Sequence, residues 1–127
     1  MKRHLLLFAL FALPLASAHA GARSSAPVVV QPTWRQAWGD AATARSATTG
    51  SPSITCYVYS SAAGSTMVCQ ARTSAGTTGF CFSQAPSMIQ TALMSGPNSF
   101  YTFSWDTTST CTYLSVDNGS QWGLIEP

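Results

Sequence analysis

The sequence has few charged residues and almost no histidine or lysine. Of its 127 residues, six are Lys or Arg, four are Asp or Glu and two are His. The lysine, Lys2, and both histidines, His4 and His19, lie at the N-terminus. A general base near neutral pH is usually a histidine, a lysine or a tuned carboxylate. No Ser-His, Cys-His or Ser-Lys site can be built from residue 20 onward, so we expect a protein that is not an enzyme.

Paired carboxylates are the one catalytic arrangement that this composition leaves open. The candidates are Asp106, Asp117 and Glu126. Asp106 and Asp117 stand beside small or hydroxyl residues, where a carboxylate commonly caps the backbone amides of a turn. We therefore expect turn capping at both positions. The sequence has no phosphate loop, dinucleotide motif or metalloprotease helix, and it predicts no cofactor.

One hydrophobic run stands out, at residues 5–15. It follows three basic residues and precedes a small-x-small cleavage site, Ala18-His19-Ala20, which together predict a signal peptide over residues 1–20, cleaved near Ala20. The run is shorter than the roughly 20 residues of a membrane-spanning helix. We expect a bacterial protein, secreted or periplasmic, that does not insert into a membrane.

The charges beyond residue 20 cancel. This part of the sequence has four basic and four acidic residues. They are Arg23, Arg35, Arg45 and Arg72, and Asp40, Asp106, Asp117 and Glu126. Affinity for nucleic acid rests on several clustered cations, which this balance does not supply. The sequence therefore predicts no nucleic-acid partner.

The four cysteines are separated by 13, 12 and 30 residues. They are Cys56, Cys69, Cys81 and Cys111. A metal site would need closely paired thiols, usually with histidine, so no metal is predicted. An even number of cysteines in an exported chain predicts two disulfides, with three ways to pair them.

Residues 21–53 are rich in Ala, Ser, Thr, Gly and Pro and have no sustained apolar period. They predict a mobile leader to a folded domain at residues 54–127. A short helix after Pro32 would place Trp34 and Trp38 on one face. Two hypotheses follow: the indoles pack onto the core, or they form an aromatic arm that engages a partner.

Residues 54–60, 65–72 and 79–83 alternate polar and apolar residues around glycine-bearing turns, as strands do. A four-residue loop with Gly64 left-handed puts Cys56 opposite Cys69, and a three-residue loop with Gly76 left-handed puts Cys69 opposite Cys81. The first and third strands then lie about twice 4.8 Å apart, beyond the disulfide limit of about 7 Å. This argues against Cys56–Cys81 and leaves two pairings: Cys56–Cys69 with Cys81–Cys111, which we prefer, or Cys69–Cys81 with Cys56–Cys111.

Residues 85–96 predict one short helix, because Pro86 suits its first turn and apolar residues recur at helical spacing. The apolar positions, expected in the core, are Met88, Ile89, Ala92 and Leu93. Strands over 99–105 and 111–116 and a turn over 117–119 follow, and residues 121–125 are a candidate edge strand. The predicted fold class is mainly β, a small α+β domain with antiparallel strands in the order β-β-β-α-β-β, one short helix and two disulfides.

This element order resembles the oligonucleotide/oligosaccharide-binding (OB) fold of the cell-binding subunits of bacterial five-plus-one toxins. In those subunits a helix such as PSMIQTALMS precedes a hairpin resembling FYTFSWDTTSTCTYLSV, and the helices line a pentamer pore. The resemblance covers residues 54–122. It implies a partly closed OB-like barrel or curled sheet, and a homo-oligomer.

Period-two alternation assigns the two faces of the predicted strands. The core face holds Ile54, Val58, Met67, Ala71, Tyr101, Phe103, Trp105, Leu114 and Val116. The candidate ligand-binding residues face outward and are Tyr57, Tyr59, Gln70, Arg72 and Tyr113. The same alternation turns Cys111 outward, so its disulfide requires a bulge or an irregular start of the last strand. Tyrosines beside an amide and a guanidinium suit a sugar ring or a partner protein, whereas cross-strand pairing of tyrosines is the structural alternative.

The sequence thus predicts a non-enzymatic module that recognises a glycan or a protein at a cell or envelope surface. One alternative is an inhibitor of a hydrolase that plugs a cleft with residues 61–64 or 73–78. Another is a structural or host-interaction surface protein with no small ligand.

Overall fold

The structure is a computed structural model that describes residues 24–122. These residues form two antiparallel sheets and two short helices. The predicted signal peptide, Glu126 and most of the predicted strand over residues 121–125 lie outside the described residues.

The first sheet is the predicted three-stranded meander. Its strands are β3 (Ser53–Ser61), β4 (Gly64–Arg72) and β5 (Thr78–Ser83), in that order. Cys56 lies opposite Cys69, and Cys69 lies opposite Cys81, as predicted. The strands run further than expected, so that the first loop shrinks to residues 62–63. Gly64 and Gly76 have φ angles of 118° and 89°, a region that favours glycine.

The second sheet has four strands in the order β1-β2-β6-β7. They are β1 (Val29–Gln31), β2 (Gln36–Asp40), β6 (Phe100–Trp105) and β7 (Cys111–Asp117). A register shift between Ser104 and Trp105 pairs Trp105 with Cys111 and Ser104 with Tyr113. This is the predicted bulge, and it turns Cys111 into the core.

The prediction of a mobile leader over residues 21–53 is wrong for its described part. Residues 29–40 form the β1–β2 hairpin, and α1 (Ala41–Ser46) follows directly, with the buried carboxylate of Asp40 accepting hydrogen bonds from the amides of Ala42 and Thr43. The buried residues here are mostly Ala and Val, whose small side chains leave only a weak apolar period. In addition, β2 pairs with β6, a strand far away in the sequence, so no local sequence pattern predicts this pairing.

The predicted helix around Trp34 and Trp38 is also wrong. Trp38 lies in β2, paired with Thr102, and Trp34 lies in the β1–β2 turn with 77% of its surface exposed. The two indoles therefore do not share a helical face.

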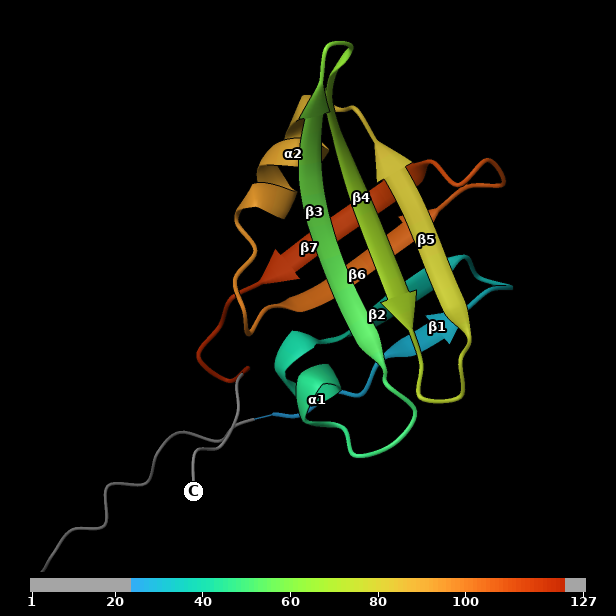
Figure 1. The fold of residues 1–127 in the computed structure, drawn as a ribbon, viewed down its shortest axis with the longest axis vertical. Helices are drawn as coiled ribbons and strands as arrows, with labels where there is room; N and C mark the ends of the chain where they lie inside the picture. Colours follow the sequence, from blue (N-terminus) through green and yellow to red (C-terminus); the bar gives the residue numbers. More distant parts are fainter. Residues whose placement is uncertain (1–23, 123–127) are drawn as a thin grey trace, which may run out of the picture.

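The two sheets pack face to face and cross obliquely, with the core between them (Figure 1). All nine residues predicted for the core face are buried or packed against the buried cluster. A single parallel bridge, Phe82 with Thr110, joins the sheets at one corner, and the described residues do not close into a barrel. The fold class is mainly β, with two disulfides, as predicted.

Each helix touches both sheets. The first, α1, contacts β2 and β3, and α2 (Pro86–Leu93) contacts β3, β4 and β7. Pro86 occupies the first turn, Ala92 is buried, and Met88 and Ile89 pack against the core. Leu93 does not, because the helix ends there and leaves it exposed. Neither helix of the described part is long and apolar enough to cross a membrane.

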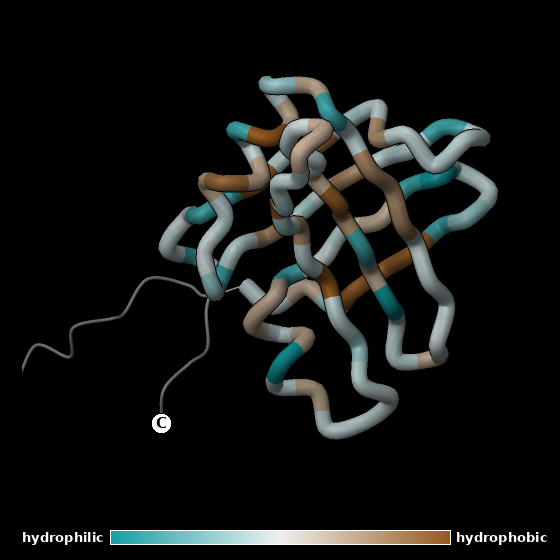
Figure 2. The backbone as a smooth tube through the Cα atoms, turned by 45° about the horizontal axis from the view of Figure 1, so that its top comes forward, coloured by the Kyte–Doolittle hydropathy of each residue, from teal (hydrophilic) through white to brown (hydrophobic). Residues whose placement is uncertain are grey.

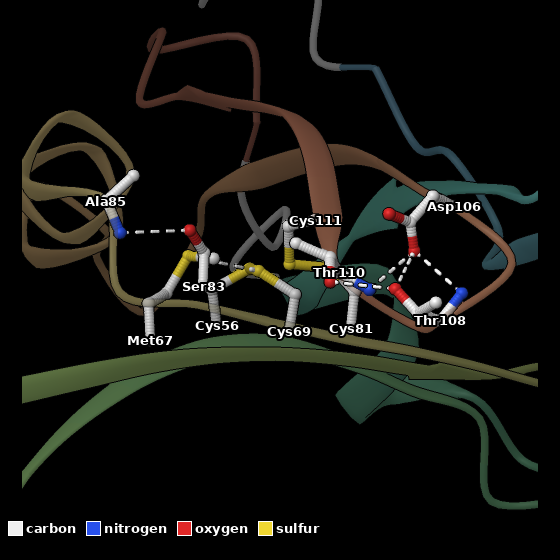
Figure 3. Close-up of a disulfide and its surroundings, with 10 residues drawn as sticks. All are labelled: Cys56, Met67, Cys69, Cys81, Ser83, Ala85, Asp106, Thr108, Thr110 and Cys111. Atoms are coloured by element: carbon white, nitrogen blue, oxygen red, sulfur yellow. Dashed lines mark hydrogen bonds between the residues drawn. A yellow bond between two sulfur atoms is a disulfide. The ribbon is translucent and has the colours of Figure 1, made fainter.

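The disulfides are Cys56–Cys69 and Cys81–Cys111, the preferred pairing (Figure 3). The first joins neighbouring strands of one sheet, and the second joins the two sheets. Most of the backbone carries residues of intermediate hydropathy, with only short hydrophobic stretches (Figure 2). Small domains bury too little apolar surface to fold easily, so a covalent tie between the sheets contributes substantially to stability.

Candidate functional site

The outer face of the β3-β4-β5 sheet carries four half-exposed aromatic rings. The exposed fractions lie between 41% and 50%, for Tyr57, Tyr59, Phe80 and Phe82. The rings of Phe80 and Phe82 lie 6.2 Å apart, centre to centre, at an interplanar angle of 43°. We call this surface the aromatic face and define it as Tyr57, Tyr59, Val68, Gln70, Arg72, Phe80 and Phe82.

Strand register explains why these side chains gather. Val68 on the central strand lies directly between Tyr57 on β3 and Phe82 on β5. Side chains opposite one another across antiparallel strands share a face and lie about 5 Å apart. Val68 points away from the core, yet only 6% of its surface is exposed. Tyr57 and Phe82 therefore lie on either side of one apolar side chain, that of Val68.

Polar groups border the rings. Gln70 lies opposite Phe80, and Arg72 lies opposite Thr78 in the next row. An open hollow of about 230 Å³ lies at the end of the sheet that holds Arg72. Gln70, Arg72 and Phe80 are among the residues that line it. Arg72 is the only charged residue in the three strands. The face thus offers flat apolar area, an amide and one guanidinium, with no carboxylate among its strands to repel an anion or to do acid chemistry.

Four of the five predicted site residues are brought together. Tyr57, Tyr59, Gln70 and Arg72 all lie on the aromatic face. Tyr113 is exposed as predicted, but it lies on β7 beside Ser104, in the other sheet. It therefore cannot contact the same small ligand.

Three residues of the face are missing from the sequence prediction: Val68 and the two aromatic residues Phe80 and Phe82. The signal was present, because Cys81 points into the core and period two then turns both of its neighbours outward. Burial of an aromatic side chain in these strands is decided by which face of the sheet it lies on, and not by its hydrophobicity alone.

The candidate carboxylates are used to hold turns. Asp106 accepts hydrogen bonds from the amides of Thr108 and Thr110, at 2.8 and 2.9 Å, and from the Thr108 hydroxyl (Figure 3). Asp117 accepts from the Trp122 indole and the Gly119 amide, at 2.8 and 2.7 Å. This confirms turn capping at both.

Asp106 and Asp117 are too far apart to act together. They stand at opposite ends of β7, whose length at about 3.3 Å per residue separates them by roughly 20 Å. Paired catalytic carboxylates lie about 5 to 10 Å apart. These two therefore cannot form a glycosidase-type pair.

The turn hydrogen bonds predict a pH dependence. The Thr108 hydroxyl, then the Thr110 amide, hold the pKa of Asp106 below its ordinary value, and the Trp122 indole does the same for the pKa of Asp117. Since the folded pKa lies below the unfolded value of about 3.9, the stabilisation is complete above that value and is lost as pH falls through the folded pKa. Thermal unfolding should therefore show Tm falling below about pH 4. Asp106→Asn should show a shallower fall, and an identical profile for the two proteins would contradict this role.

A larger hollow, of about 280 Å³, lies between α1 and the start of β3. Its one charged residue, Arg45, donates hydrogen bonds to the carbonyl of Pro97 and the side chain of Asn98. Arg45 is thus engaged in holding α1 against the loop before β6, and we do not place the site there.

Among residues 24–122, one group of three side chains is close enough to hold a metal ion. It consists of Cys69, Cys81 and Cys111, whose sulfur atoms lie within 4.8 Å of one another. All three belong to disulfides and offer no thiolate in this state.

Comparisons with protein-family models, with curated proteins and with solved structures found no match to this chain in any of the three.

Proposed function

We propose that this protein is a secreted, non-enzymatic recognition module whose aromatic face binds a glycan or a protein at a cell or envelope surface. The observation that carries the proposal is the gathering of four half-exposed rings on one sheet face with a single charge. Exposed aromatic clusters of this kind are uncommon on surfaces without a partner. The absence of histidine and lysine beyond residue 20 argues against catalysis.

The chemistry of the face suits a neutral or weakly anionic glycan well. Tyr and Phe rings supply flat apolar area for the C–H faces of a sugar, and Gln70 and Arg72 supply donors beside Phe80. A protein ligand would use the same rings as central anchors. In both cases the affinity comes from the rings, so the same variants test both ligand classes.

Replacing Tyr57 and Phe82 together by Ala should weaken ligand binding at least about tenfold, because buried aromatic anchors commonly contribute more than 1 kcal/mol each. The measurement is titration of the ligand found on a glycan or protein array, by calorimetry. Tyr113→Ala is the matched control, since Tyr113 is equally exposed on the other sheet. Loss of binding in Tyr113→Ala, with Tyr57→Ala/Phe82→Ala unaffected, would place the site elsewhere.

The inhibitor function remains a second candidate because of one observation. The β3–β4 hairpin extends past the rest of the sheet, and residues 60–64 at its tip are exposed (Figure 1). A protruding tip of small residues is a shape that can enter a cleft. Stoichiometric inhibition of a hydrolase, lost on changes at the tip and kept in Tyr57→Ala/Phe82→Ala, would favour this candidate over recognition by the face.

The toxin-subunit resemblance adds a ring-shaped homo-oligomer to the proposal. Light scattering of the protein from residue 21 onward measures its mass in solution. A monomer would remove the analogy with toxin subunits and leave the aromatic face as the proposed site.

A further inference from the structure

The two disulfides lie side by side in the core. The sulfur atoms of Cys69, Cys81 and Cys111 are within 4.8 Å of one another, although Cys69 belongs to one disulfide and the other two form the second (Figure 3). The Sδ atom of Met67 lies a further 3.8 Å from the Cys69 sulfur. All four cysteines are buried, so these sulfurs contact protein groups and one another.

Strand register gives Cys69 two neighbouring cysteines. It lies directly opposite Cys56 on one side and directly opposite Cys81 on the other. The Cα atoms of Cys56 and Cys69 are 4.1 Å apart, as in a non-hydrogen-bonded pair of strand residues. The pair with Cys81 is then of the hydrogen-bonded kind, with Cα atoms about 5.5 Å apart, which also suits a disulfide.

We propose that Cys69 is an exchange centre between the two disulfides. When the bond from Cys69 to Cys56 opens, the Cys69 thiolate attacks the sulfur of Cys81. A Cys69–Cys81 bond forms, the Cys81–Cys111 bond breaks, and Cys111 leaves as a thiolate that takes up a proton. The number of disulfides is unchanged in this step, so no oxidant or reductant is needed.

A small thiol can start the sequence. A thiolate RS⁻ attacks Cys56, forms an RS–Cys56 mixed disulfide and releases the Cys69 thiolate, which then attacks Cys81. The exchange changes which strands are joined by a disulfide. Cys81–Cys111 joins the two sheets, whereas Cys69–Cys81 joins two strands of one sheet. The exchange therefore converts a cross-sheet tie into one within a sheet and frees β7 at Cys111.

The positions of the arginines make the exchange directly readable. Trypsin cuts after Arg45 and Arg72, so Cys56 and Cys69 fall in one fragment, and Cys81 and Cys111 fall in the next. The native pairing keeps each disulfide within a fragment. A Cys69–Cys81 bond instead joins the two fragments, which non-reducing mass spectrometry detects after free thiols are alkylated at low pH.

Cys56→Ala tests the proposal, with Cys69→Ala as the matched control. Each variant leaves one thiol unpaired in the same strand pair. Cys56→Ala should give joined fragments with alkylated Cys111, at least tenfold more than Cys69→Ala, which should keep Cys81–Cys111 and show alkylated Cys56. Unjoined fragments with alkylated Cys69 in Cys56→Ala would overturn the proposal, and so would equal joining in both variants.

The wild-type chain provides a second measurement that needs no substitution. With reduced glutathione added, joined fragments carrying glutathione on Cys56 should accumulate at least tenfold above the untreated protein. Reduction of the disulfides with no joined fragment at any time would contradict the exchange.

Discussion

Removing the Cys81–Cys111 disulfide with Cys81→Ala/Cys111→Ala is expected to lower the free energy of unfolding by about 3 to 4 kcal/mol. This bond spans 30 residues of sequence and joins the two sheets at buried positions. A cross-link over a longer loop restricts the unfolded chain more strongly. Replacing both cysteines avoids an unpaired thiol that could exchange with Cys69.

The matched variant is Cys56→Ala/Cys69→Ala. Its bond spans 13 residues and joins neighbouring strands that also share backbone hydrogen bonds. The chain-entropy relation gives about 3 kcal/mol here, less than for the longer loop. Urea unfolding followed by circular dichroism measures both values. A larger loss for Cys56→Ala/Cys69→Ala would mean that the sheets are held together mainly by packing.

Phe103→Ala is expected to cost about 3 to 5 kcal/mol, which is a large share of the total stability of a small domain. Phe103 is fully buried on β6, between Ala37 and Leu114 on the neighbouring strands, and its ring lies 5.7 Å from that of Trp105. Its removal leaves a cavity that the side chains of Ala37 and Leu114 cannot fill.

Phe80→Ala is the control for this prediction, because it makes the same change at a ring that is 46% exposed. We expect it to change stability by less than about 1 kcal/mol, as is usual away from the core. The two variants can be compared by urea unfolding under the same conditions. Equal destabilisation would show that the aromatic face is part of the structural core and is not free for a ligand.

The meander was predictable from sequence because several local signals agree there. Glycine-bearing turns set the register of Cys56, Cys69 and Cys81, and a spatial limit on disulfides then excluded one pairing. Alternation alone would turn Cys111 outward. A disulfide to Cys81 requires Cys111 to point inward, and a bulge at the start of the strand makes this possible.

The β1–β2 hairpin and its place in the second sheet were not predictable in the same way. The hairpin buries Val30 and Ala37, whose small side chains give little contrast with the surrounding Ala, Ser and Thr. β2 pairs with β6, which follows it by about 60 residues, and such pairing depends on the whole fold. Of the described residues that suggested a leader, Pro32 lies in the β1–β2 turn, and Gly50, Ser51 and Pro52 lie in the loop between α1 and β3.

The aromatic face was half predicted. Alternation placed Tyr57 and Tyr59 outward, but it could not show that Tyr113 belongs to a different sheet, since the order of strands in space is not a local property. Phe80 and Phe82 could have been found by applying the same alternation on both sides of Cys81. A ligand site is thus defined here by register, not by any motif.

Array binding of three proteins tests the central claim most directly. Wild-type protein, Tyr57→Ala/Phe82→Ala and Tyr113→Ala are applied to one glycan and surface-protein array at equal concentrations. The proposed function predicts that wild type and Tyr113→Ala bind the same ligands, and that Tyr57→Ala/Phe82→Ala loses them while keeping its circular dichroism spectrum. Unchanged binding by Tyr57→Ala/Phe82→Ala, or no ligand bound by the wild-type protein, would contradict recognition through the aromatic face.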